Sequence, residues 1–373
     1  MNIVHVVSSP VTAAAGVREA YMRLSKAQCA TSGDIVSVVG LNHPDWPKEA
    51  SKWVGGTPYL FDVIGPRSLG YAPNMLSGIE ALNPDIVHLH GLWMHSGRSV
   101  LQWAKKTRKP YVVSVHGMLS DVALSYGRQK KRFVLQWFQK EVLERAAAIH
   151  VTSSAEADEV FKFGLNNPLI QIPNGVEQLY LSVNQTSTKD KVVLSLGRFH
   201  KKKGLSLLLK AWQPLEKEFP DWSLLLVGPD QDGEVNRLKG LSSELGLSKV
   251  RFHGQVWDKQ KIDIMASASI FALPSLSENF AITVAESLML GVPVVCSKGA
   301  PWQGLDEHKC GKWVDIGPEP MEHGLRELMC LSPEKLQDMG QRGREWMIQD
   351  YSWDSIALAM RSEYQSVLEK SVS

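Results

Sequence analysis

Short apolar runs of strand length alternate with helical patterns along most of this 373-residue chain. In the first half these runs lie at residues 3–7, 35–39, 59–64, 86–90, 111–116, 148–152 and 169–172. In the second half they lie at residues 192–196, 223–227, 250–253, 270–273, 293–296 and 312–314. Strands separated by helices usually pair in parallel, with helices covering both faces of the sheet. The alternation therefore predicts an α/β fold built on doubly wound parallel sheets.

The alternation is interrupted after residue 172. The turn sequence Pro173-Asn174-Gly175 is followed by a polar stretch over residues 182–191, and a new strand begins at Val192. We therefore expect one Rossmann-like domain over residues 1–180 and a second over residues 181–350. A final helix over residues 351–373 is expected to cross back to the first domain. Ligands of doubly wound sheets bind beyond the carboxyl ends of the strands, so two domains facing a central cleft predict an active site in that cleft.

The bulk composition is that of a soluble globular protein. Apolar residues make up 44% of the chain, charged residues 21%, and the net charge is only +2, which argues against a nucleic-acid partner. The four cysteines lie far apart without metal-ligand spacing, which is typical of a reduced cytoplasmic protein. No apolar run approaches the roughly 18 residues of a membrane-spanning helix, so any membrane contact is expected to be peripheral.

Positive charge is nevertheless concentrated in one part of the first domain. From Arg98 to Arg145 the chain has eleven Lys or Arg residues and three acidic residues, a local excess of eight positive charges. The basic run Arg128-Gln129-Lys130-Lys131-Arg132 leads directly into an apolar and aromatic segment that contains Phe133, Trp137 and Phe138. Such a helix can lie on an anionic membrane surface. It can equally be a packed amphipathic helix with a solvated cationic face.

Two glutamates mark a strand–loop–helix unit in the second domain. Glu278 stands in the loop before an apolar helix over residues 281–290, and Glu286 is the charged residue on that helix. The N-terminus of a helix presents unpaired N–H groups and partial positive charge, which suit a phosphate, whereas carboxylates suit hydroxyl groups. A nucleotide-sugar has both features. In the structural alternative, the charge of Glu278 only stabilises the N-terminus of the helix, and Glu286 pairs with an Arg or Lys.

A basic loop follows the strand at residues 192–196. Its sequence is Gly197-Arg198-Phe199-His200-Lys201-Lys202-Lys203-Gly204, and a helix starts at its end. Arg198 and Lys203 can hold a diphosphate and stabilise it as it departs with added negative charge. The alternative for the lysine triplet is a solvated basic loop.

Together, Gly-Arg-(x)4-Lys-Gly and Glu-(x)7-Glu resemble the retaining glycosyltransferases of family 4, which have the GT-B fold. The resemblance extends over nearly the whole chain. It includes Pro173-Asn174-Gly175-Val176, Leu226-Val227-Gly228, Val250-Arg251-Phe252-His253-Gly254 and Gly291-Val292-Pro293-Val294-Val295.

The resemblance implies a catalytic set of His116, Arg198, Lys203 and Glu278. Arg198 and Lys203 would bind the donor diphosphate, Glu278 the sugar hydroxyls and Glu286 the ribose hydroxyls. The remaining donor-binding positions would be Gly16, Gln255, Val256, Asn279, Phe280 and Ala281. His116 would lie near the anomeric centre, and His90 would line the acceptor side.

The chain departs from the family pattern at two points. The first loop has Ala13-Ala14-Ala15-Gly16 where the family often has Gly-Gly. The usual Gly-Phe-Gly after the first glutamate is Asn279-Phe280-Ala281. Asn tolerates left-handed backbone and Ala is small, so we expect the second loop to keep its conformation. The preferred donor sugar can differ from that of other family members.

The resemblance implies a retaining hexosyltransferase that uses a UDP-sugar such as UDP-glucose. The expected acceptor is a saccharide, which is either soluble or lipid-linked. The expected process is the synthesis of cell envelope or exopolysaccharide, in the cytoplasm or at the inner face of the membrane. No carboxylate nucleophile is evident beside His116, which favours a front-face mechanism without metal or other cofactor. Asp230-Gln231-Asp232 resembles a metal motif but is interpreted as a turn and helix cap.

Two other functions stay open, a nucleotide-sugar epimerase and a non-catalytic nucleotide-sugar-binding protein. A dehydrogenase is disfavoured because Ser8-Ser9-Pro10, not a glycine-rich turn, follows the first strand.

Overall fold

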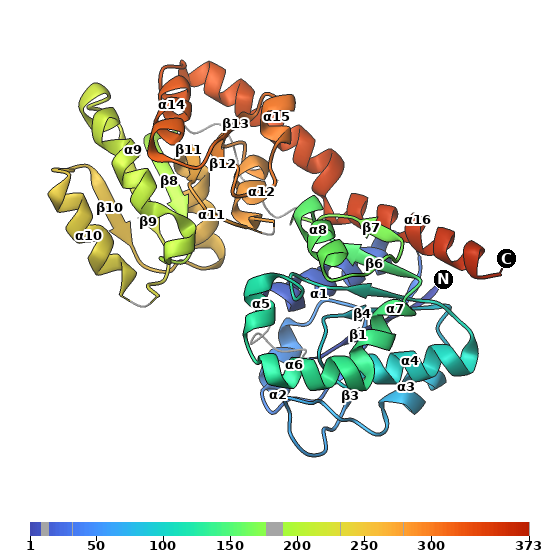
Figure 1. Cartoon of the computed structure of the whole chain (residues 1–373). Helices are drawn as coiled ribbons and strands as arrows, with labels where there is room; N and C mark the ends of the chain where they lie inside the picture. The colour runs from blue at the N-terminus through green and yellow to red at the C-terminus, as the bar shows by residue number, and fades with distance from the viewer. Residues whose placement is uncertain (9–14, 32, 177–188, 232, 279, 373) are drawn as a thin grey trace. The chain divides into compact units, whose positions relative to one another are not determined.

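The computed structural model describes residues 1–8, 15–31, 33–176, 189–231, 233–278 and 280–372. The chain forms two units (Figure 1): unit 1 contains Met1–Gly175 and Trp353–Ser373, and unit 2 contains Val176–Ser352. The sequence predicts the domain boundary between residues 180 and 181, whereas the structure has it between Gly175 and Val176. The chain leaves unit 1 at Gly175 and returns to it at Trp353, so unit 1 is discontinuous in sequence.

Unit 1 contains a parallel sheet with strand order β3-β2-β1-β4-β5-β6-β7 among the described residues. The strands are β1 (Asn2–Val7), β2 (Ile35–Leu41), β3 (Thr57–Phe61), β4 (Ile86–His90), β5 (Tyr111–Ser114), β6 (Ala148–Val151) and β7 (Leu169–Gln171). The order reverses between β1 and β4. Beyond such a switch point, loops diverge and leave room for a ligand at the carboxyl ends of the strands.

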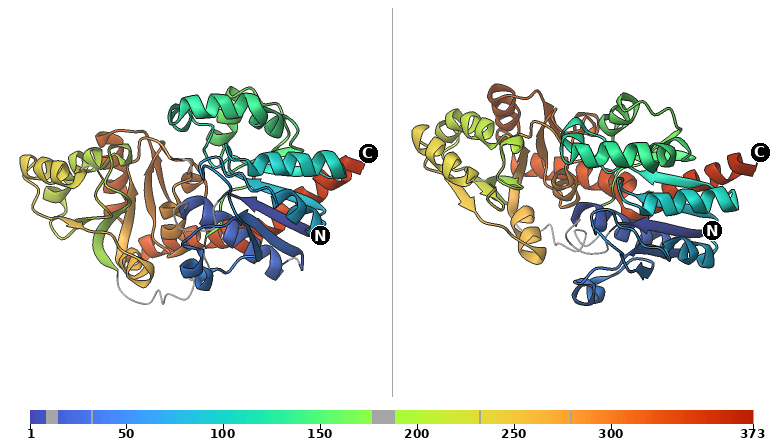
Figure 2. Two further views of the ribbon diagram at one scale, coloured as in Figure 1. Left: turned by 90° about the horizontal axis from the view of Figure 1, so that it is seen from below. Right: turned by 60° about the horizontal axis from the view of Figure 1, so that its bottom comes forward.

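Helices cover both faces of this sheet. One face packs against α1 (Ala15–Thr31) and α16 (Trp353–Val372), which lie side by side (Figure 2). The other packs mainly against α3 (Met75–Leu82), α4 (Ser96–Thr107), α7 (Lys140–Glu144) and α8 (Ser154–Lys162). Shorter helices are α2 (Trp46–Glu49), η2 (Ala50–Lys52), α5 (Asp121–Ser125) and α6 (Arg128–Val134).

The basic and aromatic segment is not one regular helix. The sequence pattern predicts a single helix over residues 129–147, but α6 passes into a π-helical turn, η3 (Leu135–Gln139), and then α7. The wider turn lets the buried Gln139 side chain accept a hydrogen bond from the Trp93 backbone N–H at 2.7 Å. Phe133 and Trp137 stay exposed, whereas Val134 and Phe138 are buried.

Unit 2 contains a second parallel sheet with order β10-β9-β8-β11-β12-β13. Its strands are β8 (Asp190–Leu196), β9 (Ser223–Val227), β10 (Val250–His253), β11 (Ala268–Leu273), β12 (Val294–Ser297) and β13 (Gly311–Val314). The order reverses between β8 and β11, which are neighbours in the sheet although more than seventy residues separate their first residues.

Two apolar clusters pack the faces of this second sheet. The first joins it to α9 (Leu205–Glu218), α10 (Glu234–Glu244) and α14 (Pro318–Met329). The second joins it to α11 (Asp258–Ser267), α12 (Ile282–Met289), α13 (Gly304–Glu307) and α15 (Pro333–Tyr351). The short helix η5 (Lys201–Lys203) precedes α9. The predicted class, two doubly wound α/β domains, is confirmed.

Within the described residues, every helix is too short or too polar to span a lipid bilayer.

Candidate functional site

In unit 2, the loops after β8 and β11 meet at the switch point of the sheet. Gly204 has a left-handed backbone (φ 65°), and a Cβ at this position would lie 2.1 Å from the Pro274 carbonyl oxygen. The Leu276 N–H donates a hydrogen bond to the Lys202 carbonyl at 2.9 Å. Only glycine allows this approach without strain, so Gly204 brings the basic loop against the loop that contains Glu278.

Lys203 and Glu278 form an ion pair across these two loops. Lys203 Nζ lies 2.6 Å from Glu278 Oε1, which also accepts a hydrogen bond from Ser275 Oγ at 2.6 Å. The Glu278 N–H donates to the Gly299 carbonyl at 2.7 Å, which fixes the backbone of the loop. The side chains are 23% and 15% exposed, so the charges are held in place but remain accessible. The structure thus places a lysine cation and a carboxylate at one point beyond the carboxyl ends of β8 and β11.

Arg198 follows β8 but is not part of this ion pair. Its exposed guanidinium donates to Gln231 Oε1 at 3.3 Å. Gln231 belongs to the Asp-x-Asp segment, where Asp230 Oδ1 accepts a hydrogen bond from the Val235 N–H at 3.0 Å. Asp230 therefore caps the start of α10, as expected for a turn, and Asp232 lies outside the described residues.

The departure from the family glycine pattern is visible at the start of α12. Ala281 adopts the left-handed backbone (φ 61°, ψ 64°) that a glycine accepts more easily, at a cost of about 1 kcal/mol. The preceding Phe280 is buried against Trp302, and its carbonyl accepts a hydrogen bond from Trp302 Nε1 at 2.6 Å. These contacts hold the strained turn. Asn279 lies outside the described residues.

Glu286 is buried on α12 and pairs with Lys261 of α11, with 2.6 Å between Lys261 Nζ and Glu286 Oε1. The structural alternative for Glu286, pairing with a basic residue, is thus present. Val256 is buried and Gln255 exposed after β10. Gly16 lies in the first turn of α1, next to residues that are not described.

In unit 1, histidines occupy the carboxyl half of the sheet face that packs against α1 and α16. His5 Nδ1 lies 2.8 Å from His90 Nε2, and His90 Nδ1 lies 3.1 Å from His116 Nε2. His5 Nε2 continues this chain to Gln28 Oε1 at 2.8 Å. Burial lowers the pKa of His5 to about 4 and also lowers the pKa values of His90 and His116, so these rings are neutral at pH 7.

The loop that holds His116 is fixed by a buried carboxylate. His116 has a positive φ of 48° and is half-buried. Glu156 of α8 accepts a hydrogen bond from the Gly117 N–H through Oε1, and one from the Thr152 N–H through Oε2 at 2.6 Å. The ring of His116 is therefore held at the end of β5.

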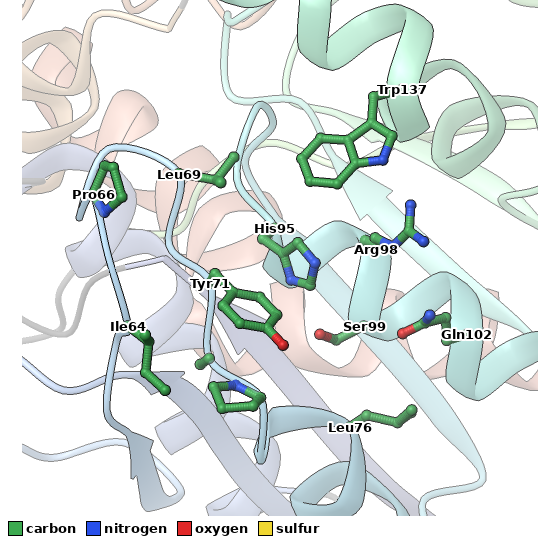
Figure 3. Close-up of a pocket in the computed structure, with 12 residues that line it drawn as sticks. Ile64, Pro66, Leu69, Tyr71, Leu76, His95, Arg98, Ser99, Gln102 and Trp137 are labelled. Atoms are coloured by element: carbon green, nitrogen blue, oxygen red, sulfur yellow. The ribbon is translucent and has the colours of Figure 1, made fainter.

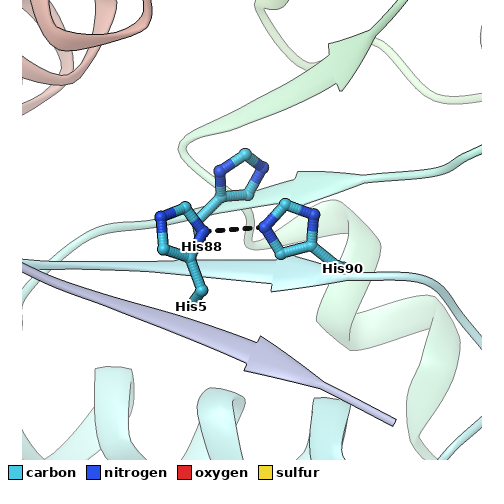
Figure 4. Close-up of side chains that lie close together, drawn as sticks. All are labelled: His5, His88 and His90. Carbon is cyan, nitrogen blue, oxygen red and sulfur yellow. Dashed lines mark hydrogen bonds between the residues drawn. The ribbon is translucent and has the colours of Figure 1, made fainter. Parts of the chain in front are cut away.

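By distance, His5, His88 and His90 could hold a metal ion, since donor atoms from the three rings lie within 4.8 Å of one another (Figure 4). All six ring nitrogens already have hydrogen-bond partners, including Tyr364 and Ser114 on either side of His88. A metal would have to displace several of these bonds, so the cluster is better described as a hydrogen-bonded network.

A cavity of about 600 Å³ lies on the other face of unit 1, between α3, α4 and Trp137 (Figure 3). Its lining includes apolar residues (Ile64, Pro66, Leu69, Leu76) and polar ones (Tyr71, His95, Arg98, Ser99, Gln102). The Arg98 guanidinium lies 5.3 Å from the centre of the Trp137 ring. No carboxylate in the described part of the chain forms an ion pair with Arg98. The cavity therefore joins an apolar wall to a cation.

Two family models together match nearly all of this chain. Residues 5–175 match the glycosyl transferase 4-like domain, and residues 178–346 match glycosyl transferases group 1. The chain belongs to the family 4 glycosyltransferases. This glycosyltransferase has the GT-B fold that its motifs predict.

Individual relatives agree with this assignment. A GDP-mannose:cellobiosyl-diphosphopolyprenol alpha-mannosyltransferase from Xanthomonas oryzae pv. oryzae is 26% identical, over 99% of this chain and 97% of the relative. A glycosyltransferase from Rickettsia africae has a TM-score of 0.76 and 16% identity, with 98% of each chain covered. Anabaena HepE in complex with UDP and glucose has a TM-score of 0.72 and 19% identity, covering 98% of this chain and 100% of that one. The two structures show the fold alone.

The motifs of the glycosyltransferase do not point to Lys261, His5 or Gln28. Lys261 stands on a helix without any motif, and its role depends on the packing of α11 against α12. A signal for His5 exists, since it interrupts an otherwise apolar strand, and a polar residue there needs a partner. Its partners follow only from the strand order.

Proposed function

We propose that this glycosyltransferase transfers a hexosyl unit from a nucleoside-diphosphate sugar to a lipid-linked saccharide, with retention at the anomeric carbon and without a metal ion. The observation that carries the proposal is the Lys203–Glu278 pair at the switch point of unit 2. When the donor binds, Lys203 contacts the diphosphate and Glu278 accepts hydrogen bonds from sugar hydroxyls. Arg198 turns from Gln231 towards the phosphates.

In the proposed reaction the bond between the anomeric carbon and the phosphate oxygen breaks, and the nucleoside diphosphate leaves with the electron pair. The acceptor hydroxyl attacks the same face of the sugar, and its proton passes to the departing phosphate oxygen. Lys203 and Arg198 stabilise the charge that develops on that phosphate. His116 contacts a hydroxyl group of the reacting sugars.

For the donor we propose GDP-mannose first, because the mannosyltransferase relative spans nearly the full chain. UDP-glucose, the donor expected from the sequence, is the second candidate, and HepE in complex with UDP and glucose has the same fold. A thermal-shift panel of both, with UDP-glucuronate, UDP-N-acetylglucosamine, GDP and UDP, separates them. At a hundred times Kd a donor adds about 2.7 kcal/mol, or roughly 5–10 °C in Tm for a unit of this size.

Lys203→Ala and its exposed neighbour Lys202→Ala form a matched pair for the same panel. Loss of the donor shift in the first variant with retention in the second supports the proposed site. Equal shifts in both variants would show that the donor binds elsewhere.

The lipid-linked acceptor is supported by the cavity of unit 1 and the segment beside it. Arg98 and the basic helix α6 supply positive charge for a phosphate, and exposed Phe133 and Trp137 supply aromatic surface for a membrane interface. The named acceptor of the Xanthomonas relative is a diphosphopolyprenol. We therefore propose that the protein works at the cytoplasmic face of the membrane, in the synthesis of cell-envelope polysaccharide or glycolipid.

Vesicle flotation tests this second part. Vesicles with phosphatidylglycerol should retain the protein at low salt and release it at high salt, whereas phosphatidylcholine vesicles should not retain it. Trp137→Ala combined with Phe133→Ala should weaken retention, whereas replacing the exposed Trp257 of unit 2 should not. Equal binding to both vesicle types, or to neither, would contradict the membrane proposal without affecting the donor site.

Two other functions predict different products. An epimerase converts the nucleotide-sugar without an acceptor, and a binding protein shifts Tm without turnover. Incubation of the preferred donor alone and with a lipid-linked disaccharide, followed by mass spectrometry, distinguishes the three.

A further inference from the structure

Beside the His5–His90–His116 chain of unit 1 lies another branch of hydrogen bonds. Tyr364 of α16 and Ser114 of β5 contact the two ring nitrogens of His88 at 2.6 and 2.7 Å. Ser114 Oγ lies 2.6 Å from His150 Nδ1, and His150 Nε2 lies 2.9 Å from the Ile172 carbonyl oxygen. A neutral imidazole has one donor and one acceptor, so fixing one end of such a chain fixes every proton in it.

The Ile172 carbonyl fixes the first branch, because a carbonyl oxygen can only accept. His150 Nε2 therefore donates, and its Nδ1 accepts the hydroxyl hydrogen of Ser114. Ser114 Oγ accepts from His88 Nε2, which leaves His88 Nδ1 to accept the hydroxyl hydrogen of Tyr364.

The side-chain oxygen of Gln28 fixes the second branch, because an amide oxygen can only accept a hydrogen bond. Gln28 Oε1 lies 2.8 Å from His5 Nε2. His5 Nε2 must then donate to Gln28, and His5 Nδ1 must accept from His90 Nε2 (Figure 4).

The last step reaches His116. His90 has used Nε2 as a donor, so its Nδ1 accepts from His116 Nε2. We propose that the chain Gln28–His5–His90 fixes His116 as the Nε2–H tautomer, so that His116 offers Nδ1 to a substrate hydroxyl as a hydrogen-bond acceptor. Among the described residues, none forms a hydrogen bond with that nitrogen. The role towards substrate rests on the proposed function, whereas the tautomer rests on the network alone.

Gln28, His5 and His90 are then positioning residues that need not touch substrate. All three are at least 97% buried, and charging any of the rings is disfavoured by burial, so the proton arrangement persists through the neutral pH range. An acceptor nitrogen on His116 can take a hydrogen bond from an attacking or a sugar hydroxyl. It cannot donate one to an oxygen without a hydrogen, which restricts the groups that the site can recognise.

Nitrogen-15 NMR of the histidine-labelled full-length protein at pH 7 tests the tautomer directly, with His116→Gln used to assign the signal. The expected result for the wild type is a proton on Nε2 and a bare Nδ1. In Gln28→Met the anchor is lost, and His116 should become a mixture of tautomers. The kcat/KM should fall in proportion to the fraction of molecules that lose the Nε2–H tautomer, on the order of two- to tenfold.

Ser114→Ala is the matched control, because it removes a buried hydrogen-bonding group from the other branch. It should destabilise unit 1 and leave the His116 tautomer unchanged. A proton on Nδ1 of wild-type His116, or an unchanged tautomer in Gln28→Met, would overturn the inference. An Nε2–H signal in a protein without transferase activity would support the tautomer and refute the proposed function.

Discussion

Acidification should destabilise unit 1 before unit 2. His5, His88, His90, His116 and His150 all have pKa values lowered chiefly by burial. Unfolding returns these rings to water, where the pKa of histidine is about 6.5. The unfolded state therefore binds more protons than the folded state below that pH. The stabilisation that the buried neutral histidines give to the folded state is fully present above about pH 6.5. It is lost as the pH falls towards their pKa values in the folded protein.

His5 alone sets a lower limit on the size of this effect. Its side chain is fully buried, and burial lowers its pKa from 6.5 to about 4. Linkage then predicts that His5 contributes about 2 kcal/mol less at pH 5 than at pH 7. For a urea m-value of about 2 kcal/mol/M, the unfolding midpoint of unit 1 should fall by about 1 M.

Methionine oxidation along a urea series, followed by mass spectrometry, gives both units a separate midpoint in one sample. Met75 reports on unit 1, and Met289 and Met347 report on unit 2, since all three are fully buried. His5→Gln removes the titrating ring, so its midpoints at pH 7 and 5 should lie about 1 M closer together than in wild type. Exposed His253→Gln in unit 2 is the control. If the urea midpoint reported by Met75 at pH 5 matched or exceeded its value at pH 7, the buried neutral histidines would not account for the pH dependence of the stability of unit 1.

Four further predictions concern the donor site and the packing of unit 2. Lys203→Ala and Arg198→Ala should each lower kcat/KM on the order of 10²–10³-fold, because each removes a positive charge that stabilises the departing diphosphate. Wild-type turnover in either variant would show that this residue does not bind the diphosphate. Transfer should proceed at full rate in EDTA, and a loss that manganese restores would contradict the metal-independent mechanism. Gly340→Ala in α15 should destabilise unit 2 by about 2 kcal/mol or more, because its Cβ would lie 2.1 Å from the Gly291 carbonyl. Gly240→Ala in α10, with nothing within 4 Å, should stabilise the unit by about 0.5–1 kcal/mol, and chemical denaturation compares the two.

The strands were predictable because most of them are short apolar runs, and β4, β5, β6, β11 and β12 are buried along their whole length. β4, β9 and β10 have the bounds expected from the sequence. The π-helical turn was not predictable, because it depends on the Gln139 side chain meeting the backbone of Trp93, which lies 46 residues away. Local patterns give the type of an element, whereas its irregularities come from tertiary contacts.

The same limit applies to the site. Sequence motifs point to Lys203 and Glu278 separately, but the ion pair joins residues 75 positions apart and follows from the strand order β8-β11. The network around His116 depends on register, since β1 and β4 align His5 with His88 and Val7 with His90. No single stretch of sequence contains that information.

The return of the chain at Trp353 has a consequence for synthesis on the ribosome. The surface of the first sheet that α16 covers, including Ile3, Ile86 and His88, stays open until the whole of unit 2 has been translated. At typical elongation rates this takes on the order of ten to thirty seconds. Unit 2, although second in sequence, is then the first to hold all its parts, and the nascent first sheet is the natural client for a chaperone during that interval.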